Sequence, residues 1–144
     1  KDALEGLFEK TLPVETERRQ PPGSVLQVTL SPLRIFRHRS VAFHSRSHAL
    51  MSAMADLLSK PDSGRRYEVE MLLGAGPGLS RDQDRRRDFL ARRAAAFAAR
   101  LRALGVPGSA IRVGLDSRRL EEIELTFFDL NVDRARVSFG HLVR

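Results

Sequence analysis

The chain has 144 residues and contains neither cysteine nor tryptophan. Without cysteine it cannot form a disulfide, a thiolate metal site or a cysteine nucleophile. No apolar run approaches the roughly 18 residues that a membrane-spanning helix needs. The absence of cysteine leaves the compartment open, because such a chain suits oxidising and reducing environments equally.

Lysine is also scarce. Of the 25 basic residues only Lys1, Lys10 and Lys60 are lysines, and the rest are arginines. The formal net charge is +7, which favours anionic partners such as nucleic acid, anionic lipid or cell-wall polymer. A high-GC genome gives the same excess of arginine without any such partner, and composition does not separate the two interpretations.

A hydrophobic fraction of 42% predicts a folded chain with a single core. Leu4, Leu7 and Phe8 share one face of a short helix over residues 2–10. The segment 13–24 is polar and carries three prolines. We therefore expect an N-terminal helix and linker over residues 1–23, and one domain with a C-terminal tail over residues 24–144.

Hydrophobic periodicity predicts four strands and two helices in this domain. The strands are expected at residues 25–30, 66–73, 109–115 and 121–128, the helices at 46–59 and 82–104, and a weaker strand-like stretch at 136–139. The order strand–helix–strand–helix–strand–strand predicts an α/β two-layer sandwich, with a mixed sheet and both helices on one face.

Apolar side chains at these periods are the predicted core. They include Phe89, Leu90, Phe97, Leu101 and Leu104 in the second helix, and Ile123, Leu125 and Phe127 in the last strand. The segment 33–45 is irregular, and its apolar anchors are Leu33, Ile35, Phe36 and Phe43. Gly105 is expected to cap the second helix. Phe128 points to the other face of the sheet, where residues 132–144 are expected to cover it.

Two ordered sets of residues resemble the motifs of a known family. The first is Ile35-Phe36, Ser40-Val41 and Phe43; the second is Phe89-Leu90, Arg93-Ala94, Phe97, Leu101, Gly105-Val106 and Ile111–Val113. Over roughly residues 25–128 the chain is similar to the OmpA-like domain, also called the MotB C-terminal or peptidoglycan-associated domain.

This resemblance implies a ligand site. Arg93 matches the family arginine that binds the carboxylate of diaminopimelate in the peptidoglycan stem peptide, where an aspartate binds the amine. Here Gly74–Gly78 stands in place of the aspartate motif, and Arg86 in place of an asparagine. We therefore expect a degenerate peptidoglycan site comprising Arg93, Arg86, Gly76 and Gly78, in which binding is lost or altered.

Two clusters of arginine suggest a further surface. Arg37 and Arg39 lie before the first helix, while Arg85 and Arg87 lie at the start of the second. Together they are a candidate anion-binding patch. The alternative is a solvated helix face, because aspartates alternate with arginines over residues 81–93 and pair at helical spacing. The glycine loop before this helix is interpreted as a connector, with a small anion nest as the alternative.

The sequence contains few signals of a catalytic site or a metal site. His44 and His48 are spaced for one helix face, but no third ligand lies close in sequence, so we interpret them as surface residues. Glu121 and Glu122 begin a strand and are interpreted as edge charges. We expect no catalytic residue, no metal and no cofactor.

The resulting expectation is a non-catalytic periplasmic domain, anchored by a membrane tether upstream of Lys1. It acts as a structural or protein-interaction module in a bacterial envelope assembly of the secretion or motor type. The expected partners are envelope-assembly proteins, with peptidoglycan and a second copy of the chain as further candidates. The alternative is a basic α/β domain that binds nucleic acid or another polyanion, although a single tyrosine offers little base stacking.

Overall fold

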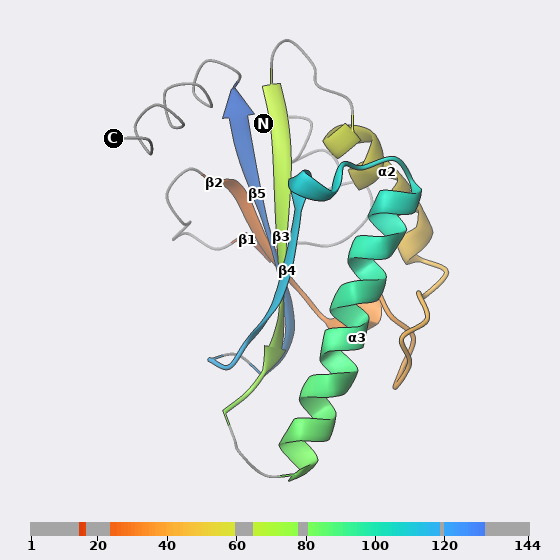
Figure 1. Cartoon of the computed structure of the whole chain (residues 1–144), viewed down its shortest axis with the longest axis vertical. Helices are drawn as coiled ribbons and strands as arrows, with labels where there is room; N and C mark the ends of the chain where they lie inside the picture. The colour runs from red at the N-terminus through yellow and green to blue at the C-terminus, as the bar shows by residue number, and fades with distance from the viewer. Residues whose placement is uncertain (1–14, 17–23, 60–64, 78–80, 119, 132–144) are drawn as a thin grey trace.

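The computed structural model describes residues 15–16, 24–59, 65–77, 81–118 and 120–131 (Figure 1). The strands are β1 (Glu15–Thr16), β2 (Ser24–Leu30), β3 (Arg65–Ala75), β4 (Ile111–Asp116) and β5 (Leu120–Asn131), and the helices are α2 (Ser47–Ser59) and α3 (Arg81–Ala103). Two short 3-10 turns, η1 (Pro32–Arg34) and η2 (Gly108–Ala110), complete the list. The helix expected at residues 2–10 and the stretch at 136–139 lie outside the described residues.

The strands form one mixed sheet in the order β1-β2-β5-β3-β4. Among the described strands, only β3 and β4 pair in parallel, because α3 carries the chain back between them, whereas the other pairs are antiparallel. The four predicted strands are confirmed, with β4 beginning at Ile111 because Gly108–Ala110 form a 3-10 turn. The two-residue β1, which pairs with β2, was not predicted.

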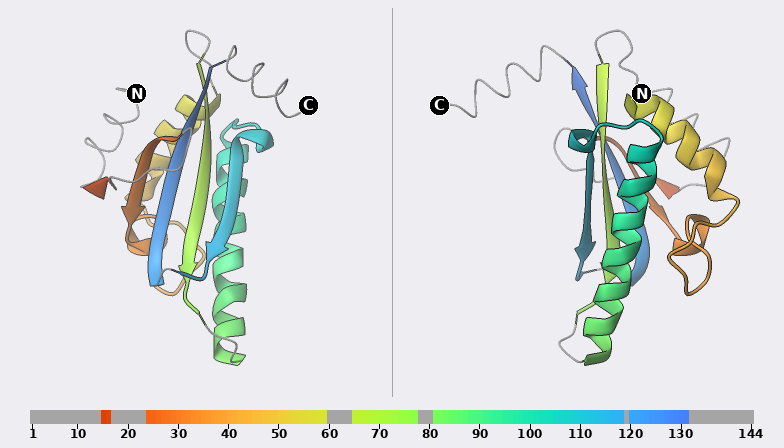
Figure 2. Two further views of the ribbon diagram at one scale, coloured as in Figure 1. Left: turned by 90° about the vertical axis from the view of Figure 1, so that its left-hand side faces the viewer. Right: turned by 45° about the vertical axis from the view of Figure 1, so that its right-hand side comes forward.

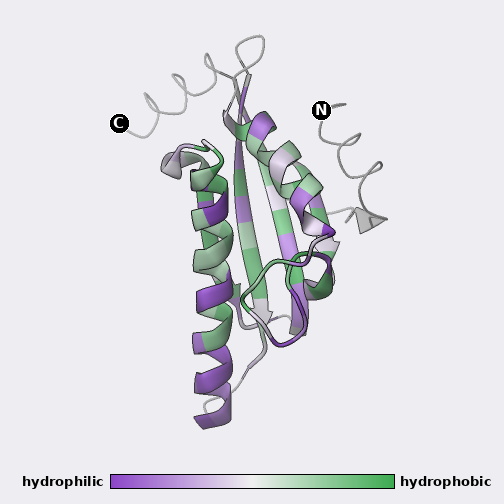
Figure 3. Cartoon of the chain, turned by 90° about the vertical axis from the view of Figure 1, so that its right-hand side faces the viewer, coloured by the Kyte–Doolittle hydropathy of each residue, from purple (hydrophilic) through white to green (hydrophobic). Residues whose placement is uncertain are grey.

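Both helices cover the same face of the sheet, which confirms the two-layer α/β sandwich (Figure 2). Seen from the helix side, the first half of α3 is mostly hydrophilic and its second half carries more apolar residues (Figure 3). In this view the segment that joins β2 to α2 lies beside the middle of α3 (Figure 3).

The core lies between the two layers, where the predicted alternation of β3 holds. Its buried side chains include Tyr67, Val69, Met71 and Leu73 from β3, Ile123, Leu125 and Phe127 from β5, Leu50, Met54 and Leu58 from α2, and Leu90, Phe97 and Leu101 from α3. On the opposite face, Phe128 is half-buried, with the Arg112 guanidinium 5.1 Å from its ring centroid. The residues expected to cover Phe128 are not among those described.

Two predicted core positions were wrong. Leu33 is 49% exposed, because it sits in the η1 turn and the following Ile35 and Phe36 fill the core instead. Leu104 is 40% exposed, because the chain reverses direction at the end of α3 and Val106 takes the buried position.

The end of α3 confirms the predicted cap. Gly105 has a φ of 104°, its N–H donates to the carbonyl of Arg102, and the N–H of Val106 donates to the carbonyl of Leu101. This pair of hydrogen bonds is a Schellman motif, in which a residue of positive φ ends the helix and satisfies its last carbonyls.

Candidate functional site

The segment that joins β2 to α2, residues 31–46, is here called the arginine loop. It is a folded loop with a bridge between Phe36 and Phe43, whose rings stack at a centroid distance of 5.3 Å. The N–H of Arg37 donates to the carbonyl of Ala42 at 2.9 Å and closes the hairpin-like tip. These contacts fold the loop onto itself.

Arg93, the central residue of the predicted ligand site, lies inside the protein and is only 6% exposed. Its Nε donates to the carbonyl of Ser40 at 2.8 Å, and its Nη2 donates to the carbonyl of Arg37 at 3.0 Å. The guanidinium carbon lies 4.9 Å from the ring centroid of Phe36 and 4.5 Å from that of Phe89. Arg93 therefore fastens the arginine loop to α3.

Burial lowers the pKa of the Arg93 guanidinium, because desolvation disfavours the charged form. The two carbonyls offset part of this cost by accepting charge-assisted hydrogen bonds. The sequence left open whether Arg93 faces a ligand pocket or a carboxylate of its own chain. In the structure both of its hydrogen bonds go to backbone carbonyls.

Arg93 also lines a cleft of about 510 Å³ between the arginine loop and α3, here called the Arg93 cleft. The predicted residue Arg86 lines it too, and its Nη2 lies 3.4 Å from Oε1 of Glu121. Gly76, which has a φ of 72°, does not line this cleft. Gly78 is not among the described residues. The structure thus brings together two of the four residues of the predicted peptidoglycan site.

Glu121 is the residue of this cleft that the sequence analysis missed. It was interpreted as an edge charge, but β5 is an inner strand that pairs with both β2 and β3. Glu121 itself has a φ of 48°, at the position where the pairing of β3 and β5 shifts register. Because 35 residues separate Glu121 from Arg86, no local sequence signal predicts their contact.

The four arginines of the predicted anion patch have different surroundings in the structure. Arg37 and Arg39 both belong to the arginine loop, but only Arg39 lines the Arg93 cleft. Arg85 is exposed on α3, and Nη2 of Arg87 donates to the carbonyl of Gly76 at 3.3 Å.

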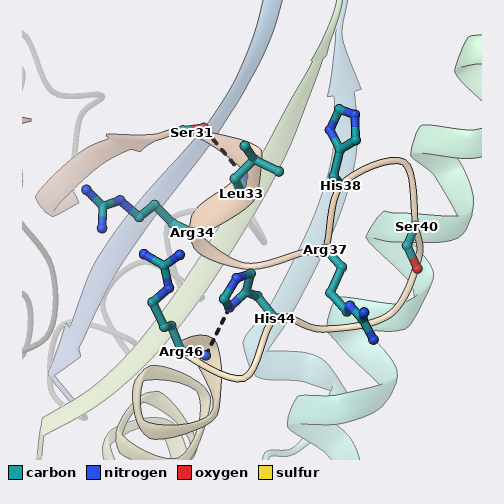
Figure 4. Close-up of a pocket in the computed structure, with 8 residues that line it drawn as sticks. All are labelled: Ser31, Leu33, Arg34, Arg37, His38, Ser40, His44 and Arg46. Carbon is teal, nitrogen blue, oxygen red and sulfur yellow. Dashed lines mark hydrogen bonds between the residues drawn. The ribbon is translucent and has the colours of Figure 1, made fainter.

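A second cleft, of about 770 Å³, opens on the arginine loop and is here called the arginine cleft (Figure 4). Its described lining is Ser31, Leu33, Arg34, Arg37, His38, Ser40, His44 and Arg46. None of these described residues is acidic. The sequence placed a basic cluster in this segment, but only the folded loop shows which of its cations share one hollow.

His44 has a structural role in this loop. Its Nδ1 accepts a hydrogen bond from the N–H of Arg46 at 3.2 Å, and its carbonyl accepts from Oγ of Ser47 at 2.7 Å. These contacts fix the chain as it enters α2. Over the described part of the chain, no three histidine or acidic side chains gather in a way that could hold a metal ion.

Within the same part of the chain, no helix has the length and apolar character needed to cross a bilayer.

Neither a family model nor a curated protein sequence matches this chain. Solved structures do match it. A putative MotB-like protein from Desulfovibrio vulgaris is 9% identical, with a TM-score of 0.63 over 90% of this chain and 91% of its own. The periplasmic domain of Helicobacter pylori MotB is 15% identical, with a TM-score of 0.58 over 92% of this chain and 89% of its own.

The OmpA-like domain of FopA1 from Francisella tularensis is 11% identical, with a TM-score of 0.51. It covers 82% of this chain and 81% of its own. Identities this low carry information about architecture only. The chain therefore has the fold that OmpA-like domains and MotB periplasmic domains share.

Proposed function

We propose that the chain is a non-catalytic OmpA-like module of a bacterial envelope assembly, which works through contacts with other envelope proteins and has lost diaminopimelate binding. One observation carries this proposal: both hydrogen bonds of the Arg93 guanidinium hold the arginine loop. A ligand carboxylate that took both donors would leave two carbonyls without their partner.

The carboxylate that would bind the ammonium group of diaminopimelate also has another partner. An ammonium group needs a carboxylate, and the described carboxylate that lines the Arg93 cleft belongs to Glu121. That side chain is 75% exposed and already faces Arg86. An exposed carboxylate beside an arginine is a weak partner for an ammonium group, because water and the neighbouring cation compete for it.

The proposed location and partners rest on analogy with proteins that have the same fold. The MotB domains of the same fold are described as periplasmic, and we place this chain in the same compartment, tethered to the membrane by a segment upstream of Lys1. Envelope-assembly proteins of the secretion or motor type, and a second copy of the chain, are its proposed partners.

Cosedimentation with purified peptidoglycan sacculi tests the loss of ligand binding. Wild type is compared with Arg93→Ala and with Arg102→Ala, which removes the same charge from the exposed surface of α3. The assay is run at low and at near-physiological salt, with and without free diaminopimelate. We expect weak pelleting that fades with salt and that diaminopimelate leaves unchanged.

One pattern would overturn the proposal: pelleting of wild type that survives salt, that free diaminopimelate releases, and that Arg93→Ala abolishes while Arg102→Ala retains it. Circular dichroism of Arg93→Ala shows whether that variant is folded, and the diaminopimelate competition gives an answer from wild type alone.

A further inference from the structure

We propose that the arginine cleft binds a compact group with two or more phosphates, carried either by a soluble molecule or by a lipid headgroup. Three arginines and two histidines line this one hollow: Arg34, Arg37, Arg46, His38 and His44. In the view into the cleft, the side chains of Arg34 and Arg46 lie on one side of His44 and that of Arg37 lies on the other (Figure 4).

The arginine side chains of the cleft have no anionic partner in the described part of the chain. The ion pairs found there join Arg86 to Glu121 and Arg118 to Asp116. The guanidinium groups of Arg34, Arg37 and Arg46 make neither a hydrogen bond nor an ion pair with a described residue. Like charges held in one hollow repel each other, and a bound anion removes this repulsion.

Contacts within the protein hold the backbone around the cleft in place before a ligand binds. Arg93 holds the carbonyls of Arg37 and Ser40 from the side of α3, and the stacked rings of Phe36 and Phe43 close the base of the tip. The hydrogen bond from the Arg46 N–H to His44 fixes the other wall. A rigid wall reduces the entropy that ligand binding must overcome.

The number of cations selects the class of ligand. One guanidinium is enough for one carboxylate, because the two groups form a paired set of parallel hydrogen bonds. Three guanidinium groups match about three negative charges, which two phosphate groups supply at about 1.5 to 2 charges each. The volume of about 770 Å³ accommodates such a group together with the molecule that carries it.

This site does not depend on the loss of diaminopimelate binding. The two clefts share only Ser31, Leu33 and His38 among their described linings, and the arginines of one do not line the other. The Arg93 cleft contains the carboxylate of Glu121, whereas the described lining of the arginine cleft is without acid.

Isothermal titration with inorganic pyrophosphate at near-physiological salt tests the proposal. The double variant Arg34→Gln/Arg46→Gln removes two cations from the cleft. Its control, Arg66→Gln/Arg102→Gln, removes two exposed cations from β3 and α3 and so has the same net charge. We expect wild type and control to bind alike, and the cleft variant to bind at least about tenfold more weakly, as the loss of charge-assisted hydrogen bonds implies.

Two further titrants define the chemistry. Citrate, which has a similar charge but no phosphate, is expected to bind more weakly than pyrophosphate. Phosphatidylcholine vesicles with and without phosphatidylinositol 4,5-bisphosphate, whose headgroup carries more than one phosphate, separate the two sources. Arginine-dependent binding to the bisphosphate vesicles assigns a lipid headgroup, whereas binding of pyrophosphate alone assigns a soluble ligand.

The proposal is overturned if wild type binds neither pyrophosphate nor the phosphatidylinositol 4,5-bisphosphate vesicles, or if citrate binds as tightly as pyrophosphate. Equal weakening in the cleft variant and the control would also overturn it, because binding would then follow net charge and not this cleft.

Discussion

Replacing Arg93 by alanine is expected to destabilise the protein and to release the arginine loop. The side chain is buried and reaches from α3 to a loop more than 50 residues earlier in the chain. It is the contact that joins the carbonyls of Arg37 and Ser40 to the helix. Its removal leaves both carbonyls without their donors and exposes the facing surfaces of Phe36 and Phe89.

The magnitude follows from these contacts. Two hydrogen bonds from a charged donor, at 2.8 and 3.0 Å, contribute about 1.5 to 3 kcal/mol each. Two aromatic contacts add about 0.5 to 1 kcal/mol each. The desolvation of the guanidinium, which also lowers its pKa, offsets several kcal/mol of this gain. We expect a net loss of about 2 to 3 kcal/mol in the free energy of unfolding for Arg93→Ala.

Urea denaturation monitored by circular dichroism measures this loss, with Arg102→Ala as the control. Because Arg102 is exposed on the same helix, its variant should stay within about 0.5 kcal/mol of wild type. Hydrogen exchange gives a local readout: the N–H groups of Arg37 and Ser40, which are bonded within the loop tip, should exchange faster in Arg93→Ala. A loss no larger than that of Arg102→Ala, with unchanged exchange in the loop, would refute the internal role of Arg93.

Three further changes test the fold and the Arg93 cleft. Leu101→Ala should cost about 2 to 5 kcal/mol in a denaturation experiment, because Leu101 is fully buried between α3 and the sheet; a cost below about 0.5 kcal/mol would contradict the helix face. Gly105→Ala should lower stability by about 1 to 2 kcal/mol although no atom obstructs the new Cβ, because a φ of 104° strains any residue with a side chain; an unchanged melting temperature would refute this reason. A double-mutant cycle over Arg86 and Glu121 should give a coupling of at most about 0.5 kcal/mol, since the Glu121 side chain is 75% exposed and the two charged atoms are 3.4 Å apart; a coupling above about 1 kcal/mol would mean that the pair is stronger than the exposure of Glu121 indicates.

The sequence predicted the layers of the fold well, because local period and turn chemistry carry that information. Alternation from Tyr67 to Leu73 indicated a strand with one buried face, and this face is buried. A glycine at the end of a helical pattern predicted a cap at Gly105, and the positive φ is there. The predictions that failed, Leu33 and Leu104, are apolar residues at turns, where the backbone direction and not the period decides which side chain points inward.

The candidate site was predictable only in part. The sequence singled out Arg93 and Arg86, and both line one cleft. It did not reveal that Arg93 bonds to the carbonyls of Arg37 and Ser40, because a backbone acceptor leaves no mark in the identity of the residue that carries it. Nor did it place Glu121 beside Arg86, since the start of β5 meets α3 only through the assembled sheet.

The sequence by itself determined which segments are strands and helices, which of their faces are apolar, and that the chain carries an excess of arginine. Each of these is a property of neighbours along the chain. Only the tertiary structure decided that Arg93 serves the fold, that Arg34, Arg37 and Arg46 share one hollow, and that Arg39 lies in another. The function of a cation depends on the acceptors that surround it, and segments distant in the sequence supply those acceptors once they have packed.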